Sequence, residues 1–123
     1  MDIFTSYFAK AKTLDESRFC VVSISRFAPR GFKGVRCYSF APSRELLIDY
    51  KAGLSESSYK ERYLKELGDS VQIHEVFESL VPFCKGRDLV LCCYESGDKF
   101  CHRHVLSDRV FELFGYRIKE LSL

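Results

Sequence analysis

Asp88-Leu89-Val90-Leu91-Cys92-Cys93-Tyr94 is an almost unbroken apolar run, and it sets the fold class of this chain. A second run of the same kind, Phe19-Cys20-Val21-Val22-Ser23-Ile24-Ser25, lies far upstream. Runs of this length and composition are typical of strands that are covered on both faces. Because helical patterns separate the two runs, we predict an α/β layered fold with a mainly parallel sheet.

The segments around these runs complete the predicted sheet and its helices. Alternating patterns at 2–8 and at 116–121 predict two more strands, which makes four. The helices are expected to begin at Ser43, at Ser57 or Ser58, near Val71 and at Phe100, and to end at Gly53, Gly68, Gly86 and Gly115. Residues 26–43 are expected to form a long loop. Residues 10–18 hold two helical turns at most, so the first two strands are either parallel or antiparallel. We expect one compact domain over residues 1–123, with Rossmann-like layers of helices on a four-stranded sheet.

The overall composition is that of a globular protein and does not indicate a particular binding partner. Of the 123 residues, 46% are hydrophobic and 29% are charged, and the formal net charge is only +2. Such a balance demands neither a nucleic acid nor a membrane surface. The first residues have no basic lead-in, and no window approaches the roughly 20 apolar residues of a membrane span. We therefore expect a cytoplasmic protein without a membrane partner.

The chain contains six cysteines, which are Cys20, Cys37, Cys84, Cys92, Cys93 and Cys101. An even number admits a disulfide framework. Three of them lie inside strand-like runs, however, and the chain is long enough to form its own core. We therefore expect all six to be reduced thiols in a reducing compartment.

Polar residues gather where the predicted strands end. Ligands of open parallel sheets bind outside the carboxyl ends of the strands, so these residues are expected to share one edge. The residues expected to bind an anion are Ser6, Ser25, Arg26, Arg30, Tyr94, Glu95 and Arg103. The residues expected to react are Cys101, His102 and His104.

Cys101 lies near the first turn of its predicted helix, where the helix dipole and nearby cations lower the pKa of a thiol. His104 is three positions further and shares its helix face, so a thiolate–imidazole pair is one hypothesis and an inert packed cysteine is the other. A regular helix from Phe100 directs His102 and Arg103 inward and leaves Cys101 and His104 off the core stripe. An inward arginine needs either a bound anion or a carboxylate, for which Asp98 and Glu95 are the candidates.

Residues 92–104 contain cysteine sulfurs and histidine nitrogens, which are common metal ligands. The spacing of these residues differs from that of a structural zinc knuckle. Cys92 and Cys93 point to opposite faces of a strand, so at most one of them can join such a site. No metal and no cofactor are expected.

The loop from Arg26 to Arg36 interleaves basic and aromatic residues. That mixture suits phosphate contacts and base stacking, and it equally suits a solvated loop anchored by Phe27 and Phe32. The glycine signatures of phosphate loops and of dinucleotide folds are absent.

The chain resembles the bacterial and phage proteins grouped as domain of unknown function 488. The resemblance rests on Thr5-Ser6-Tyr7-Phe8, on Ser23-Ile24-Ser25-Arg26-Phe27 with Pro29-Arg30-Gly31-Phe32, on Ala41-Pro42-Ser43 with Leu46-Leu47 and Tyr50-Lys51, and on Cys93-Tyr94-Glu95 with Phe100-Cys101-His102-Arg103-His104. It implies a compact α/β domain and a site with Ser6, Arg26, Cys101, His102 and Arg103. It implies no particular reaction.

Three functions follow as hypotheses. The first is an enzyme or binder of a small anionic ligand, phosphorylated or nucleotide-like, around residues 101–104. The second is a non-catalytic module that binds nucleic acid or a nucleotide through the loop at 26–36. The third is a bacterial or phage protein-interaction factor. An exposed apolar patch at residues 43–67 would favour this third hypothesis. The oligomeric state has no signature in the sequence.

Overall fold

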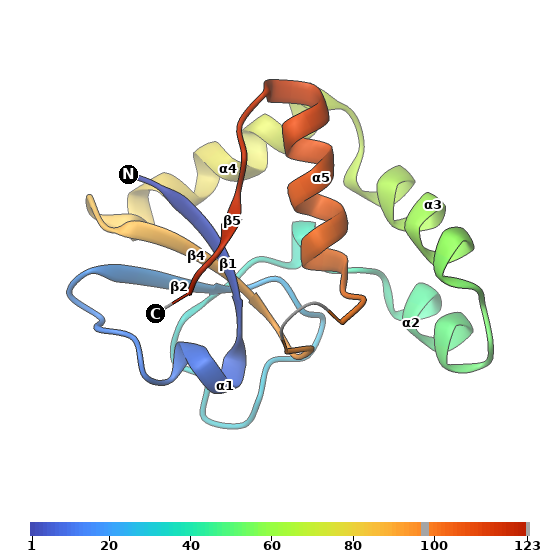
Figure 1. The fold of residues 1–123 in the computed structure, drawn as a ribbon, viewed down its shortest axis with the longest axis horizontal. Helices are drawn as coiled ribbons and strands as arrows, with labels where there is room; N and C mark the ends of the chain where they lie inside the picture. Colours follow the sequence, from blue (N-terminus) through green and yellow to red (C-terminus); the bar gives the residue numbers. More distant parts are fainter. Residues whose placement is uncertain (97–98, 123) are drawn as a thin grey trace.

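A computed structural model of the chain describes residues 1–96 and 99–122 (Figure 1). Within these residues, parallel strands form one sheet in the order β3-β2-β4-β1-β5. The strands are β1 Ile3–Tyr7, β2 Phe19–Ser23, β3 Val35–Arg36, β4 Asp88–Cys93 and β5 Lys119–Glu120. The apolar strand β4 lies in the middle, with Leu91 opposite both Thr5 of β1 and Val22 of β2. The first two strands are therefore parallel to each other, each paired to β4.

The predicted α/β class is confirmed, and the strand count is corrected from four to five within the described residues. The additional strand, β3, lies inside the segment predicted as a loop. Its two residues are too few to form an alternating pattern, and they pair through the register Val22↔Val35 and Ser23↔Arg36. The last strand is likewise shorter than predicted, since only Lys119 and Glu120 pair with β1.

The described helices are α1 Phe8–Ala11, the 3₁₀ turn η1 Tyr38–Phe40, α2 Arg44–Lys51, α3 Glu56–Leu67, α4 Ser70–Cys84 and α5 His102–Phe114. The four predicted helices correspond to α2, α3, α4 and α5, and the described residues add the short α1 and a 3₁₀ turn. Ser43 caps α2 as predicted, with its Oγ accepting from the N–H of Leu46 at 3.1 Å. The predicted start of α3 is wrong, because Ser55 is the residue that caps it. No helix among the described residues is both long enough and apolar enough to cross a membrane.

The two faces of the sheet are covered differently. Helices α3, α4 and α5 pack on one face around Val22, Leu89 and Leu91. The opposite face is covered by the short α1 and by Phe32 of the loop, which pack around Val90 and other apolar side chains. Since side chains alternate along a strand, Cys93 belongs to the helix-rich face and Cys92 to the other. This alternation decides which residues of β4 meet α5.

Candidate functional site

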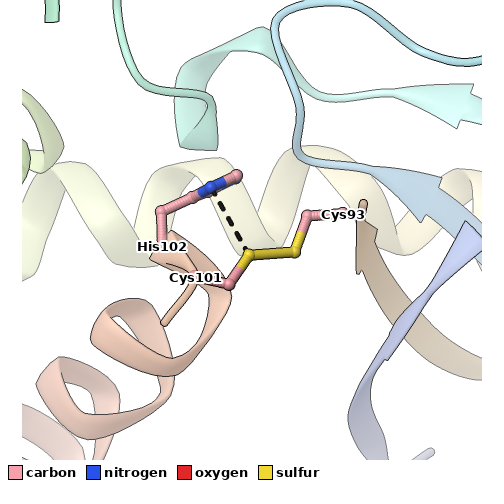
Figure 2. Close-up of side chains that lie close together, drawn as sticks. All are labelled: Cys93, Cys101 and His102. Atoms are coloured by element: carbon pink, nitrogen blue, oxygen red, sulfur yellow. Dashed lines mark hydrogen bonds between the residues drawn. A yellow bond between two sulfur atoms is a disulfide. The ribbon is translucent and has the colours of Figure 1, made fainter. Parts of the chain in front are cut away.

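The centre of the site is the junction between β4 and α5. Strand β4 ends at Cys93, and Cys101 occupies the position just before α5 in an extended conformation. Their sulfur atoms are joined in a disulfide (Figure 2). The expectation of six reduced thiols is therefore wrong for this pair. It is confirmed for the other four, which are Cys20, Cys37, Cys84 and Cys92.

The imidazole of His102 lies beside the Cys101 sulfur, with Nδ1 at 3.8 Å from Sγ. Its other nitrogen, Nε2, lies 2.6 Å from the backbone carbonyl of Ile24. A carbonyl oxygen only accepts, so Nε2 carries the proton and Nδ1 carries a lone pair. Burial lowers the pKa of His102 to about 4, against the opposing effect of the bond to Ile24. The ring is thus neutral near pH 7, with its basic nitrogen facing sulfur.

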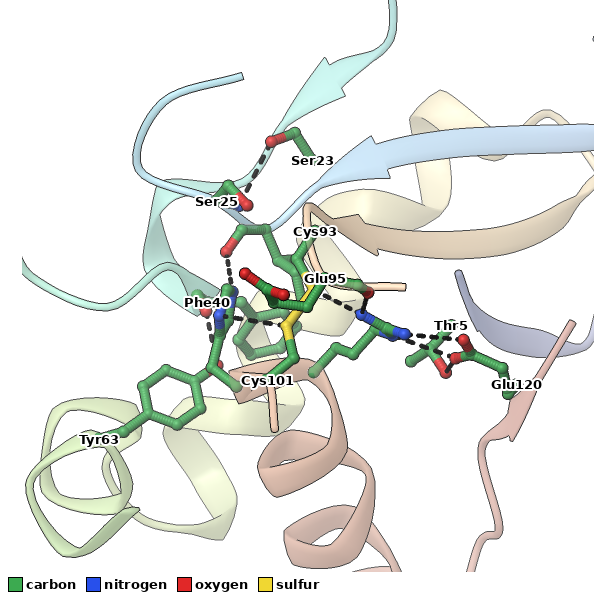
Figure 3. The surroundings of a disulfide bond; sticks show 12 residues. Thr5, Ser23, Ser25, Phe40, Tyr63, Cys93, Glu95, Cys101 and Glu120 are labelled. Atoms are coloured by element: carbon green, nitrogen blue, oxygen red, sulfur yellow. Dashed lines mark hydrogen bonds and ion pairs between the residues drawn. A yellow bond between two sulfur atoms is a disulfide. The ribbon is translucent and has the colours of Figure 1, made fainter. Parts of the chain in front are cut away.

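Arg103 is completely buried and forms an ion pair with Glu120 of β5. Figure 3 labels Glu120 together with Thr5, Cys93 and Glu95, which lie around this ion pair. The Nε and Nη2 of Arg103 donate to the two carboxylate oxygens at 3.1 and 2.8 Å. Its Nη1 donates to the Sγ of Cys93 at 2.9 Å and to the backbone carbonyl of Glu95. The carboxylate partner expected from the sequence was Glu95 or Asp98. The partner in the structure is Glu120, and Asp98 lies outside the described residues.

Glu120 is held in place from two sides. Thr5 Oγ1 donates to Glu120 Oε1 at 2.7 Å, in addition to the bonds from Arg103. Partial burial raises the pKa of Glu120, but the hydrogen bonds from Arg103 and Thr5 outweigh it, so the net pKa is lowered. The carboxylate stays ionised opposite the buried guanidinium, which satisfies the need of a buried charge for a partner.

The inward direction predicted for His102 and Arg103 is confirmed, since both are buried. The direction predicted for Cys101 is wrong, because its exposed fraction is only 6%. The helix begins at His102 and not at Phe100, so Cys101 belongs to the preceding extended segment and its direction is not set by the helical wheel. His104 is half-buried, and it is the ring of His102 that is within reach of the Cys101 sulfur.

A cleft of about 630 Å³ opens beside this junction, between the carboxyl ends of β2 and β4 and the helices α2 and α3. Its lining residues are Ser25, Arg26, Phe27, Pro42, Arg44, Leu47, Ile48, Tyr50, Lys51, Tyr59, Tyr94, Glu95, Phe100, Cys101 and His102. This is the edge of the sheet at which open parallel folds bind their ligands.

Positive charge predominates in the cleft. Arg26, Arg44 and Lys51 line it, against the single carboxylate of Glu95. Within the described residues, none of these three cations has a carboxylate within ion-pair distance. Arg26 is nevertheless fixed in position, since its Nε donates to the carbonyl of Pro42 at 3.2 Å. The cleft therefore presents cationic groups whose charge the described side chains leave uncompensated.

Aromatic rings form one wall of the cleft. The rings of Tyr50, Tyr59 and Phe100 contact one another, with centroids 4.8 to 5.8 Å apart. Behind them, Tyr63 contacts the His102 ring at 5.4 Å and donates from its hydroxyl to the carbonyl of Phe40 at 2.6 Å. Tyr59 is buried, so the half-buried rings of Tyr50 and Phe100 provide the accessible apolar surface of this wall next to the charges.

Six of the ten residues expected at the site line this cleft, and they are Ser25, Arg26, Tyr94, Glu95, Cys101 and His102. Arg103 and His104 lie behind it on α5. Ser6 is buried and pairs in register with Cys92, so it belongs to the opposite face of the sheet. Arg30 is exposed and lines a second hollow of about 450 Å³ beside α1.

Several residues of the site escaped the sequence analysis. Arg44 and Lys51 stand at the two ends of α2, and Tyr50 and Tyr59 come from α2 and α3. The helices themselves were predicted, but no local pattern indicates that they lie over the ends of β2 and β4. Glu120 was also missed, because a single acidic residue in a terminal strand carries no signal of a buried partner.

Three side chains of this region bring potential metal-ligand atoms together, all within 4.8 Å of one another in the described part of the chain. They are Cys93, Cys101 and His102. All three are buried.

Comparison with known proteins gives one positive result. Searches of the curated proteins and of the solved structures found no match. A family model described as the active DUF488-N3 subclade matches residues 4–112. The matched span runs from β1 through most of α5 and so includes the whole cleft. The chain therefore belongs to the DUF488 family, within its N3 subclade.

Proposed function

We propose that this protein binds a small anionic, ring-bearing ligand of the phosphorylated or nucleotide-like class in the cleft, and that it acts on this ligand at the Cys101–His102 end. The observation that carries the proposal is the pairing of uncompensated cations with an aromatic wall. Guanidinium and ammonium groups suit phosphate oxygens, and aromatic faces suit a planar base. A volume of about 630 Å³ lies within the usual range for small-ligand sites.

The arrangement of sulfur and imidazole supports a chemical role at that end of the cleft. A ring nitrogen with a lone pair faces Cys101, and the Ile24 carbonyl orients the ring from its far side. When the Cys93–Cys101 bond is reduced, this places an oriented base next to a thiol, which is the arrangement that nucleophilic chemistry requires. The description of the matching subclade as active agrees with an enzyme.

The alternative ligand, a long nucleic acid, has weaker support. The basic residues of the 26–36 loop do not share one surface: Arg26 lines the cleft, Arg30 and Lys33 line the hollow beside α1, and Arg36 lines neither. A backbone-tracking surface needs a continuous stripe of cations. The third hypothesis needs an apolar patch at 43–67, where Tyr59 and Tyr63 are buried and Ile48 is the exposed large apolar side chain.

Thermal unfolding in the presence of adenosine monophosphate, adenosine or inorganic phosphate tests the proposal. The nucleotide should raise the melting temperature more than either fragment, since it alone engages both the cations and the aromatic wall. At 100 times its dissociation constant, a ligand adds about 2.7 kcal/mol to the free energy of unfolding.

The variant Arg44→Glu reverses the charge of one cleft cation. It should therefore need at least ten times more nucleotide than the wild type for the same rise in melting temperature. Lys12→Glu reverses a cation of the second hollow and is the matched control. Equal stabilisation of both variants, or none by any of the three compounds, would overturn the proposal.

A further inference from the structure

The grouping of Cys93, Cys101 and His102 goes beyond what binding in the cleft requires. Their three side chains come from the end of β4 and the start of α5, and they converge on one point (Figure 2). The atoms that converge are two sulfurs and the Nδ1 of an imidazole. Thiolates and imidazoles are the ligands that zinc and related thiophilic cations prefer.

The surroundings of these atoms are those of a metal ligand set. A ligating histidine usually donates its second N–H to a carbonyl, which fixes the tautomer and the ring orientation. The Nε2 of His102 makes such a bond to Ile24 at 2.6 Å, and its Nδ1 faces the cysteines. Arg103 donates to the Cys93 sulfur at 2.9 Å, and a cationic donor at that distance stabilises a thiolate.

The backbone also holds the two cysteines further apart than is usual for a disulfide. Their Cα atoms are 7.5 Å apart, whereas disulfides have Cα separations of about 4.4–6.8 Å. A metal ion between the two sulfurs suits a wider separation, because each metal–sulfur bond is about 2.3 Å long.

We propose that the reduced protein binds a thiophilic divalent cation, with Zn²⁺ as the reference ion, through Cys93, Cys101 and His102. A small thiol reduces the Cys93–Cys101 bond, which yields two protein thiols and the small-molecule disulfide. The cation then binds both sulfurs as thiolates and releases their protons, while Nδ1 of His102 supplies its lone pair. The disulfide is the form of the protein in which this site is closed.

The geometry also indicates on which side of the metal ion the fourth coordination position would lie. Cys101 and His102 line the cleft, and Cys93 lies behind them at the end of β4. Three protein ligands with an open side are the mark of a catalytic and not a structural zinc site. The spacing of the cysteines argued against a structural knuckle, and this three-ligand arrangement is compatible with that argument.

The site is tested by titrating the protein with Co²⁺, after reduction with a small thiol and removal of that thiol without oxygen. Thiolate ligands give an intense charge-transfer band in the near ultraviolet, and tetrahedral geometry gives visible bands. We expect one Co²⁺ per chain, displaced by Zn²⁺. Single substitutions Cys93→Ser, Cys101→Ser and His102→Asn should each weaken binding by at least tenfold.

Cys92→Ala is the matched control, since Cys92 is adjacent but faces the other side of the sheet. Circular dichroism of each variant separates lost binding from lost folding. Any variant that does not fold is replaced by alkylation of the reduced wild type, from which bound Zn²⁺ should shield Cys93 and Cys101.

Three results would overturn the inference: no charge-transfer band from the fully reduced wild type, an unchanged band in Cys101→Ser, or a Cys93–Cys101 bond that resists the reductant in the folded protein. The titration contains no organic ligand. Its outcome is therefore independent of whether the cleft binds a nucleotide.

Discussion

His102 shows at the scale of a single residue how burial fixes a chemical state. Its ring donates to the Ile24 carbonyl and contacts Tyr63, and its second nitrogen faces the Cys101 sulfur. Burial, together with the neighbouring charges of Arg103 and His104, lowers its pKa from 6.5 to about 4. The folded protein therefore resists protonation at this position, whereas the unfolded chain does not.

The consequence is a stability that depends on pH. The unfolded chain binds a proton below pH 6.5 and the folded chain only below about pH 4, so His102 contributes stability above pH 6.5 that is lost as the pH falls from 6.5 to 4. Between pH 7 and pH 5 the free energy of unfolding should fall by about 2 kcal/mol through this group. Urea unfolding at the two pH values measures it.

The variant His102→Gln should lose most of this difference, while His74→Gln should keep it, because His74 is exposed on α4. Identical pH dependence in the wild type and in His102→Gln would contradict the account of the buried neutral ring.

At the scale of elements, the ion pair of Arg103 with Glu120 ties the last strand to α5. Strand β5 pairs with β1 through two residues, Lys119 and Glu120. Backbone pairing of so short a strand contributes little to its stability. The bidentate bond to α5 and the bond from Thr5 of β1 add to this stability, as does the burial of the flanking Ile118 and Leu121. This explains why a short strand can close the edge of the sheet.

Replacement of Glu120 by Gln should destabilise the fold by about 3 kcal/mol, because it leaves a fully buried guanidinium without its carboxylate. Denaturant unfolding measures the loss, and amide exchange should show it first in β5. The matched control is Glu112→Gln on α5, whose pair with Arg109 at 3.4 Å is solvent-exposed and should be worth under about 1 kcal/mol. Similar losses of unfolding free energy in both variants would contradict the claim that the Arg103–Glu120 ion pair is strong because it is buried.

The elements also mark the limit of what local sequence can predict. The two apolar runs predict β2 and β4 because their patterns are long, and Ser43 predicts the start of α2 because its cap is a local hydrogen bond. Strand β3 leaves no such pattern, since its two residues are ordered by pairing with Val22 and Ser23. The partner of Arg103 depends on the position of β5 and is thus a product of the tertiary structure.

At the scale of the whole molecule, the location of the candidate site was predictable, but only six of the fifteen residues that line the cleft were predicted. The rule for parallel sheets places ligands at the carboxyl ends of the strands, and this rule finds Arg26, Tyr94 and Cys101 without any structure. It also gathers Ser6, which the alternation of β1 directs to the opposite face. Arg44 and Lys51 reach the cleft only through the packing of α2, which no local pattern encodes.

The claim that the cleft binds the ligand can be tested by locating the bound ligand, because the two hollows lie on different sides of the molecule. The cleft lies on the side of α2 and α3, and the second hollow lies on the side of α1. A ligand that recognises the cationic and aromatic cleft should leave the other hollow unaffected. Binding to a general excess of positive charge would affect both.

Amide chemical shifts recorded by NMR during a titration with adenosine monophosphate test this most directly. The account predicts saturable changes that cluster at the cleft, at Arg26, Lys51, Tyr94 and His102, with residues 29–35 unchanged. Changes confined to residues 29–35, or no change at millimolar nucleotide, would contradict the claim that the cleft is the binding site.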